Sequence, residues 1–468
     1  MTLRLHDTLT DQRRPLEPLE PDHVRIYSCG PTVYGPAHIG NFRSFLFADV
    51  LVRYLRYRGL RVTWVMNITD VDDKIIRGAA EAGTSIGDLA ARWLERFLAD
   101  AAALRMSPPD FMPRATEHID RMAALIQVLL DLGHAYRTED GSIFFRISSW
   151  PAYGRLARLD PEQLRSTERV EADEYGKTDV RDFALWKGPR PGEPSWDTPI
   201  GVGRPGWHVE CSAMSMAYLG PTFDIHTGGV DLLVPHHEDE LAQSEAVTGQ
   251  PFVQTWLHCA HLRLGGTKMA KSVGNISRVV DLIDAGVSTR ALRYALISVH
   301  YRQALEYSEA SLDAAAAAVD RLDALVGALE GYREARQDTG DLGEELDRAR
   351  TRFEAALDDD LNVSAALAAL FDLVRELTRR VADRGLSTAD AGRALGVLRD
   401  LDGVLAVLPD AADDPPPGVA DLLAAREAAR AGRNWAESDR LRDELLAMGV
   451  SVEDTRDGQR WRLMETVR

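Results

Sequence analysis

The chain has 468 residues, of which 45% are apolar and 27% are charged, and its formal net charge is −18. A balance this acidic argues against a protein that holds nucleic acid or an anionic membrane through bulk charge. The apolar content excludes disorder as a description of the whole chain. The length predicts about three domains at roughly 150 residues each.

The cysteines argue against a disulfide framework, because their number is odd and they lie far apart in the sequence, at Cys29, Cys211 and Cys259. Residues 1–15 lack the apolar core of a signal peptide. No run approaches the roughly 20 apolar residues of a membrane span. We therefore expect a cytoplasmic protein, a monomer that does not bind a membrane.

Lysine is rare in this chain. Its five lysines are Lys74, Lys177, Lys187, Lys268 and Lys271, and every other basic residue is arginine. Ammonium and guanidinium groups differ in shape and hydration. The close pair Lys268 and Lys271 therefore indicates a place where a compact ammonium is needed, with chance clustering as the alternative.

The first elements predict a βαβ unit. Residues 24–28 and 61–68 have the composition of buried strands, and the apolar residues of 41–57 between them have helical spacing. A further helix is expected from Lys74. The C-terminal end of the first strand should therefore lie at a ligand-binding edge.

Residues 105–200 interrupt this alternation with helices, an edge-like strand at 143–147 and a stretch rich in Pro, Gly and Trp. The alternation resumes with a helix near 211–218, a strand at 223–227, a helix at 235–247 and a strand at 255–264. The fold class we predict is α/β, a Rossmann-like parallel sheet split by an insertion, followed by a helical bundle and a small C-terminal α+β domain. The expected domains are the first half of the Rossmann-like domain (1–104), the insertion (105–200), the second half (201–287), the helical bundle (288–408), a linker (409–418) and the C-terminal domain (419–468).

In the C-terminal domain, residues 419–431 and 435–448 predict two helices. Asn434 is a suitable cap for the second helix, and Gly449 a suitable stop. A hairpin with Asp457-Gly458 as its turn is expected to follow.

The tetrapeptide His38-Ile39-Gly40-Asn41 lies between the first strand and its helix, where backbone N–H groups and the helix dipole attract a phosphate. Gly40 permits close approach of a ligand, and His38 can donate to a phosphate oxygen. Alone the signal is weak, because a histidine before a helix is more often a cap or a surface residue.

The segment Lys268-Met269-Ala270-Lys271-Ser272 follows the last strand and two glycines. Two ammonium groups on a flexible loop suit a triphosphate whose charge grows at the leaving pyrophosphate. The alternative, a solvated basic turn, leaves the lysine pair of an arginine-rich chain unexplained.

Together these two segments resemble the two signature motifs of class I aminoacyl-tRNA synthetases. The surrounding sequences YSCGPTVY, NITDVDDK, GWHVECS and PHHEDE resemble the cysteinyl-tRNA synthetase family in particular. The resemblance runs through nearly the whole chain. Two positions depart from the family pattern: Asn41, where the family often has His, and Ala270, where it usually has Ser. An amide can still donate and both lysines remain, so we expect catalysis to persist.

The resemblance implies that the protein activates L-cysteine with ATP to cysteinyl-adenylate and transfers cysteine to the 3′-terminal adenosine of tRNA(Cys). It assigns catalysis to His38, Lys268 and Lys271, and ATP binding to these three with Gly40 and Asn41. Mg²⁺ is expected to arrive with the phosphates of ATP. The bundle is then a tRNA-binding domain, and the C-terminal domain binds the anticodon.

Cys29, Cys211, His236 and Glu240 are a chemically suitable zinc set. His236 and Glu240 are four residues apart and share a helix face. His237, rotated by about 100°, is not expected to share that face with Glu240. Spacing alone leaves ordinary packing open, since free cysteines are usually buried. The resemblance implies one Zn²⁺ on these four residues.

Such a metal would bind the thiolate of cysteine, whereas an alcohol is a much poorer ligand, so selection against serine needs no editing domain. Cys29, Thr69 and Trp207 resemble the amino-acid pocket of the family; packing of Trp207 and a pre-cap position for Thr69 are the alternatives. His208 and His226 are further pocket candidates.

Two neighbouring features have structural interpretations. Cys259 matches no ligand position and is expected in the core. Asp70, Asp72 and Asp73 could suggest Mg²⁺, but a helix cap at Asp72 or Asp73 is favoured.

Two alternatives remain. An enzyme that joins activated cysteine to an amino sugar would share these motifs but not the region after residue 408, whose Trp435, Trp461 and arginines suit anticodon stacking. A non-catalytic tRNA-binding relative is disfavoured by the intact lysines and zinc candidates. Residues 419–468 hold 9 Arg against 10 Asp and Glu, so tRNA binding should depend on local arginines and stacking, and should weaken with salt.

Overall fold

The computed structural model describes residues 2–159, 181–268, 277–334, 341–410, 418–455 and 458–463. The chain divides into two compact units. The first comprises Met1–Val319, Gly340–Arg375 and Val397–Val407, and the second comprises Asp320–Thr339, Glu376–Gly396 and Leu408–Arg468. Among the described residues, no helix is long and apolar enough to cross a lipid bilayer.

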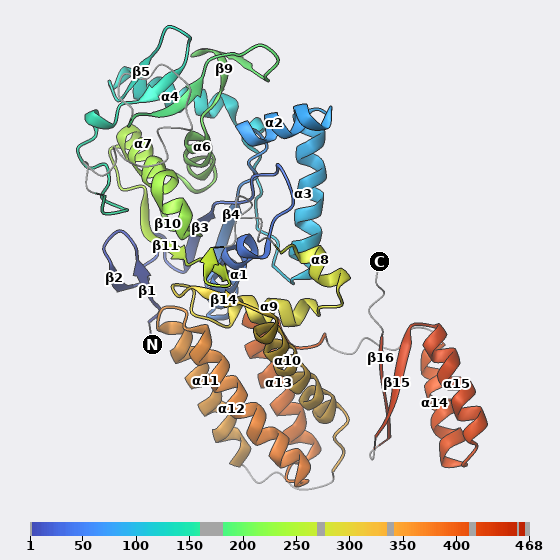
Figure 1. Ribbon diagram of the computed structural model, residues 1–468. Helices are drawn as coiled ribbons and strands as arrows, with labels where there is room; N and C mark the ends of the chain where they lie inside the picture. The colour runs from blue at the N-terminus through green and yellow to red at the C-terminus, as the bar shows by residue number, and fades with distance from the viewer. Residues whose placement is uncertain are drawn as a thin grey trace. The chain divides into compact units, whose positions relative to one another are not determined.

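A four-stranded parallel sheet forms the centre of the first unit (Figure 1). Its strands, in spatial order, are β11 (Val253–Cys259), β10 (Phe223–Gly229), β3 (His23–Ser28) and β4 (Arg61–Met66). Tyr27 pairs with Val65 on one side and with His226 on the other. The predicted α/β fold with a parallel sheet is confirmed, and the strands of its two halves, far apart in the sequence, are neighbours at β3 and β10.

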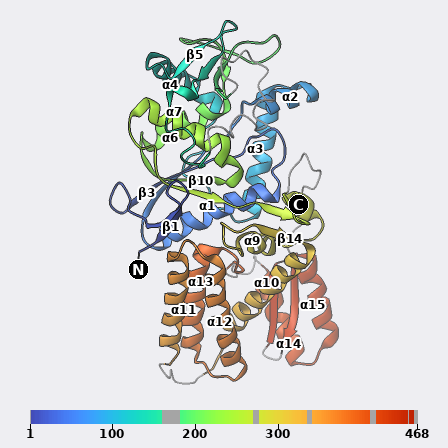
Figure 2. The same ribbon diagram turned by 60° about the vertical axis from the view of Figure 1, so that its left-hand side comes forward.

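Helices α1 (Ile39–Tyr57) and α6 (Trp207–Leu219) pack on this sheet, and α7 (Glu238–Thr248) connects β10 to β11. In both views α6 and α7 lie beside one another, whereas α2 (Asp73–Ala82) lies at one end of α3 (Ile86–Ala103) (Figures 1 and 2). The N-terminal hairpin consists of β1 (Arg4–Asp7) and β2 (Gln12–Pro15).

The segment inserted between the two halves contains α4 (Ile119–Asp131) and a second, antiparallel sheet. The strands of that sheet are, in spatial order, β5 (Ala135–Arg137), β6 (Ile143–Phe145), β7 (Phe183–Lys187), β9 (Gly201–Pro205) and β8 (Trp196–Thr198). The expectation of an edge-like strand at 143–147 is wrong, because β6 is paired on both sides. All three of its residues are apolar and buried, which is typical of an interior strand.

Three element boundaries differ from the sequence-based expectation. Helix α6 begins at Trp207, directly after its N-cap Gly206, and therefore starts before Cys211. Before α7, residues Leu233–His237 form a separate π-helical turn with extended backbone at Val234. The expected strand at 255–264 is two strands, β11 and β12 (Leu262–Leu264).

The first unit also contains shorter elements and α11. Strands β12, β13 (Thr267–Lys268) and β14 (Leu305–Tyr307) form a three-stranded sheet. The helices are α8 (Val279–Asp284), α9 (Thr289–Ile297) and α11 (Asp341–Asp358). Single helical turns are η1 (Ala115–Glu117), η2 (Ile147–Ser149) and η4 (Val230–Leu232). The boundary between the units passes through α10 (Glu309–Glu330), α12 (Val363–Ala382) and α13 (Thr388–Leu405). The predicted helical character up to about residue 408 is confirmed.

In the second unit, α14 (Val419–Ala431) and α15 (Trp435–Ala447) precede the hairpin of β15 (Val450–Thr455) and β16 (Gly458–Leu463). The predicted Asn434 cap is confirmed, since its side chain accepts from Glu437 N. Arg426 is buried and forms an ion pair of 2.9 Å with Asp454, which ties α14 to the hairpin. The expected linker lies mostly, and Asp457 entirely, outside the described residues.

A buried guanidinium ties several segments of the first unit together. Arg293 on α9 forms an ion pair of 2.7 Å with Asp49 on α1, and both side chains are fully buried. The same guanidinium donates to the carbonyl oxygens of Leu104 and Leu405. Burial lowers the pKa of Arg293, which Asp49 partly offsets. This group therefore connects α1, α9 and the ends of α3 and α13.

We predict that Arg293→Met lowers the free energy of unfolding by about 3–5 kcal/mol, because it leaves buried acceptors without a donor. The exposed Arg121 on α4 offers a matched control, and Arg121→Met should change stability by less than about 0.5 kcal/mol. Urea unfolding followed by circular dichroism measures both. Equal midpoint shifts for the two variants would contradict the assigned role of Arg293.

Candidate functional site

A cavity of about 650 Å³ opens at the C-terminal edge of the parallel sheet. Residues at or directly after the ends of all four strands line it: Cys29, Asn67, Gly229 and Ala260. The carboxyl edge of an open parallel sheet is where ligands bind in doubly wound folds. The same cavity reaches residues from both ends of the predicted site, with Cys211 and His236 at one end and His38, Gly40 and Asn41 at the other.

The structure brings the four predicted metal ligands together. The ligand atoms of Cys29, Cys211, His236 and Glu240 all lie within 4.8 Å of one another, and all four residues are buried. Cys29 Sγ lies 3.8 Å from Cys211 Sγ and 3.5 Å from Glu240 Oε1. His236 Nε2 lies 3.0 Å from Glu240 Oε1. Two sulfurs, a nitrogen and an oxygen therefore converge as a donor set typical of zinc.

The charges of this group are strongly coupled. Burial opposes ionisation of Glu240, but His226 and His236 outweigh it and lower the pKa of Glu240 to about 2. Burial likewise opposes protonation of His236, but Glu240 and Cys211 raise the pKa of His236 to about 10. A carboxylate and an imidazolium therefore share the buried site near neutral pH, so the surroundings already favour a cation there.

The two thiols differ in the direction of their pKa shifts. Burial, followed by the neighbouring Cys211, raises the pKa of Cys29. Burial opposes ionisation of Cys211 too, but the hydrogen bond donated by Cys29 and the charge of His236 lower the pKa of Cys211. One thiolate paired with one thiol is the favoured state of this pair without a metal.

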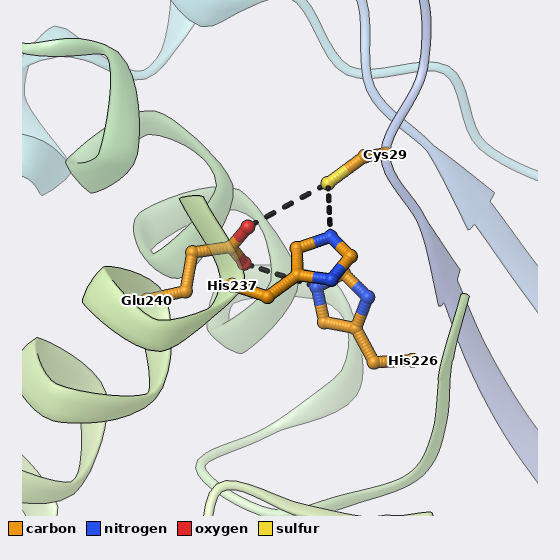
Figure 3. A group of neighbouring side chains, drawn as sticks. All are labelled: Cys29, His226, His237 and Glu240. Atoms are coloured by element: carbon orange, nitrogen blue, oxygen red, sulfur yellow. Dashed lines mark hydrogen bonds and ion pairs between the residues drawn. The ribbon is translucent and has the colours of Figure 1, made fainter. Parts of the chain in front are cut away.

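A second group of possible ligands overlaps the first and consists of Cys29, His226, His237 and Glu240 (Figure 3). His237 Nε2 lies 3.4 Å from Cys29 Sγ, and His226 Nε2 lies 3.0 Å from Glu240 Oε2. The expectation that His237 could not share a face with Glu240 is wrong. The two are three residues apart, and residues three apart on a helix are neighbours as much as residues four apart.

His237 continues into a chain of hydrogen bonds that leads away from the cavity. Its Nδ1 lies 2.8 Å from His258 Nε2, and His258 Nδ1 lies 2.8 Å from Thr8 Oγ1. Burial, followed by the charge of His226, lowers the pKa of His258 to about 3. His258 is therefore a neutral imidazole at neutral pH.

The predicted amino-acid pocket residues lie beside the first ligand group. The Trp207 ring stacks on His236, with ring centroids 4.2 Å apart. His208 Nδ1 lies 2.9 Å from His236 Nδ1. Thr69 is buried against the cavity, and its hydroxyl accepts from Asn67 Nδ2 at 3.1 Å.

The tetrapeptide at residues 38–41 forms a capping box on α1. The His38 ring accepts from Asn41 N, and the Asn41 side chain accepts from His38 N. A Cβ at Gly40 would lie 3.0 Å from His38 Nδ1, so only glycine leaves this ring its place without crowding. The cap interpretation of His38 is therefore confirmed, and both side chains also line the cavity.

For the other motif residues, the structure confirms two predictions and does not describe the side chains of the lysine pair. Asp72 caps α2 by accepting from Lys74 N, which confirms the structural interpretation of that acidic run. Cys259 is buried, as expected, at the end of β11, although it also touches the cavity. The side chain of Lys268 and the whole of Lys271 lie outside the described residues.

Comparison with known proteins identifies the family. Residues 15–317 match the model of the class I tRNA synthetase (C) catalytic domain. A cysteine--tRNA ligase of Symbiobacterium thermophilum is 47% identical over 99% of this chain and 100% of its own length. A cysteine--tRNA ligase of Alkalilimnicola ehrlichii is 47% identical over 98% of this chain and 99% of its own length. The chain belongs to the cysteine--tRNA ligase family.

The C-terminal part has family matches of its own. Residues 352–409 match the DALR domain, and residues 412–462 match the anticodon-binding domain of cysteinyl-tRNA ligases. Solved structures that share the fold include Mycobacterium tuberculosis methionyl-tRNA synthetase in complex with methionyl-adenylate, with a TM-score of 0.57, 19% identity, and coverage of 82% of this chain and 90% of that one. The Agrobacterium radiobacter K84 LeuRS–tRNA–LeuAMS complex has a TM-score of 0.61 and 12% identity, and the match covers 84% of this chain and 85% of that one.

Some residues of this cysteine--tRNA ligase site were missed by sequence reasoning. Glu210 is fully buried in α6, and burial, followed by the charge of Cys211, raises its pKa well above the ordinary value. Its Oε2 has no hydrogen-bond partner among the described residues. An acidic residue between Val209 and Cys211, in a helix that has no other charged residue except His208, is the signal that could have revealed it. His258 had no such signal, because its partners His237 and Thr8 are distant in the sequence.

The depressed pKa of His258 predicts acid lability. The folded state resists protonation down to a pH of about 3, whereas an unfolded histidine takes up a proton near pH 6.5. The stabilisation is complete above about pH 6.5 and is lost as the pH falls toward 3. We therefore expect His258→Gln to weaken this pH dependence in chelator-treated protein. As the pH falls, the free energy of unfolding should decrease less steeply, by up to about 1.4 kcal/mol per pH unit. Urea unfolding between pH 4 and 7 measures this, and an unchanged slope would contradict the assignment.

Proposed function

We propose that the chain is an active cysteine--tRNA ligase. It activates L-cysteine with ATP to cysteinyl-adenylate and transfers cysteine to the 3′-terminal adenosine of tRNA(Cys). The observation that carries this proposal is the single cavity that joins the buried sulfur, imidazole and carboxylate group to the start of α1. A cavity of this kind can hold an amino-acid side chain at one end and a nucleotide phosphate at the other.

The metal of the first ligand group is proposed to be Zn²⁺, held by Cys29, Cys211, His236 and Glu240. Three of these residues line the cavity, whereas His226 and His237 of the second group do not. The donor set fits zinc, and a fifth ligand can come from the open side. When bound, this metal favours the substrate thiolate over the hydroxyl of serine.

The amino-acid end is completed by residues of this chain. Cys29, Thr69 and Trp207 are proposed as substrate-binding residues. The Trp207 ring is fixed by stacking on His236, and the Thr69 hydroxyl is oriented by Asn67. Asn67 Oδ1 in turn accepts from Gly30 N at 2.8 Å, so the pocket wall connects to the end of β3.

His38, Gly40 and Asn41 are proposed to bind ATP. The first turn of α1 supplies the positive end of the helix dipole, whereas its Ile39 and Asn41 N–H groups are bonded within the protein. Lys268 and Lys271 are proposed to stabilise the charge that develops on the departing pyrophosphate, with His38 assisting and Mg²⁺ entering with ATP. No protein nucleophile is needed, because positioning and charge stabilisation suffice for this transfer.

The partners are proposed to be ATP, L-cysteine and tRNA(Cys), for a monomer in the cytoplasm. The match of residues 412–462 to an anticodon-binding domain supports tRNA as the acceptor. It disfavours the alternative enzyme that joins cysteine to an amino sugar, since that acceptor has no anticodon. Aminoacylation of tRNA(Cys) with labelled cysteine tests the proposal directly, and absence of charged tRNA would contradict it.

We predict that removing zinc weakens selection against serine. In cysteine- and serine-dependent ATP–pyrophosphate exchange, the preference for cysteine should fall after chelation toward the about 10- to 200-fold that an apolar pocket supplies, and should return with added Zn²⁺. Cys211→Ser should lose bound zinc, as measured by metal analysis. Cys259→Ala, which changes a buried cysteine outside both ligand groups, should retain it. Full selectivity in metal-free protein would contradict zinc as the specificity element.

A further prediction concerns Lys271. Lys271→Ala should lower the rate of cysteinyl-adenylate formation by about 100-fold, because a cation aimed at transition-state charge is lost, while cysteine binding stays nearly unchanged. Lys271→Arg keeps the positive charge, so its rate of cysteinyl-adenylate formation should fall less than that of Lys271→Ala. Single-turnover adenylate formation and equilibrium binding of cysteine separate the two effects. Comparable losses in both would contradict this role.

A further inference from the structure

Two basic side chains of α2 line the cavity and have no role in the proposed reaction so far. They are Lys74 and Arg77, and both are exposed to solvent. Helix α2 follows β4, so these cations approach the cavity from a different element than the start of α1. Two cations at this place stand out in a chain of net charge −18, in which Lys74 is one of only five lysines.

Neither side chain has an acidic partner among the described residues. Lys74 Nζ lies over the ring of Tyr34, 5.4 Å from its centroid, and makes no ion pair there. The adjacent Asp73 is already engaged, at 2.6 Å by Lys187 and at 2.5 Å by Arg204. The insertion therefore supplies the counter-ions of Asp73 and leaves the charges of Lys74 and Arg77 available to a ligand.

The platform that carries these cations is fixed by its own small core. Ile75 and Ala79 of α2 pack with Leu89 and Ala90 of α3, together with Val33. Such a core keeps the first turns of α2 at a constant position against the cavity. The two cations are therefore presented by a packed helix and not by a mobile loop.

Trp93 of α3 adds a second feature that points to a ligand. It packs against the same core and lines the cavity, and its buried Nε1 has no acceptor within the described part of the chain. Buried donors are normally satisfied, so a donor left open in a residue that lines this cavity suggests a missing polar partner. Aromatic rings beside cations are also the usual surroundings of single-stranded nucleic acid.

The cations of α2 and the residues proposed to bind the phosphates of ATP lie on different elements that line the same cavity. His38 forms a β-bridge with Arg278, which caps α8. Figure 1 shows α8 near one end of α3 and α2 at the other end. The cations of α2 and the start of α1 therefore reach this cavity from different elements.

We propose that Lys74 and Arg77 bind backbone phosphates of the single-stranded 3′ end of tRNA as it enters the cavity. The inference rests on the proposed function, in which cysteine and ATP occupy the two ends of the cavity described above. The third substrate, tRNA, must still reach the adenylate. Exposed cations bind phosphodiesters without reading bases, so these residues position the end and do not select the sequence.

The double variant Lys74→Ala/Arg77→Ala tests this in the full-length enzyme with tRNA(Cys) transcript. We expect kcat/KM for tRNA in aminoacylation to fall about tenfold or more, because two charge-assisted contacts are lost. Cysteine-dependent ATP–pyrophosphate exchange, which needs no tRNA, should stay within about twofold of the unchanged enzyme. The salt dependence of log K for tRNA should become shallower by about 1.4.

The control Arg121→Ala removes an exposed arginine of α4 that does not line the cavity, and it should change neither reaction. Lys74→Arg/Arg77→Lys keeps both charges and should recover most of the aminoacylation rate. A parallel loss of exchange and aminoacylation would overturn the proposal, since the cations would then serve ATP. Unchanged aminoacylation would overturn it as well. Absence of exchange in the unaltered enzyme would contradict the proposed function and not this inference.

Discussion

Two thiols, an imidazole and a carboxylate of buried residues meet beside one end of the cavity, and the charge at this point constrains the rest of the site. Glu240 is held ionised, with a pKa of about 2, by His226 and His236 against the opposing effect of burial. An unpaired buried carboxylate would be very costly, so the fold needs a cation beside it. In the protein without a metal, protonated His236 can be this cation. In the proposed metal site, a cation held by the same four residues would take this place once His236 gives up its proton.

The sheet brings these residues together from distant parts of the sequence. Cys29 follows β3, Cys211 lies in α6 after the inserted segment, and Glu240 lies in the first turn of α7. Pairing of β3 with β10 joins the two halves of the chain and brings Cys29 near the elements that carry Cys211 and Glu240. The same carboxyl edge supplies the His38 capping box, so one cavity reaches both the Cys29 and Cys211 thiols and the start of α1.

Local features were predictable from the sequence, and long-range ones were not. The α14 helix, the Asn434 cap and the Asp72 cap follow from local hydrogen bonding and apolar spacing, and the structure confirms them. The four ligands could be named only through the family resemblance, because their spacing alone also fits ordinary packing. The interior position of β6, the chain from His237 to His258 and the buried Glu210 depend on partners far away in the sequence. No periodicity within a single segment carries that information.

X-ray absorption at the zinc edge of the metal-loaded enzyme tests the central claim most directly, because two overlapping ligand groups compete for the ion. The account predicts two sulfurs, one imidazole nitrogen and one oxygen, from Cys29, Cys211, His236 and Glu240, with a third sulfur when L-cysteine is added. A shell of one sulfur, two imidazole nitrogens and one oxygen, unchanged by cysteine, would place the ion among His226 and His237 and contradict it.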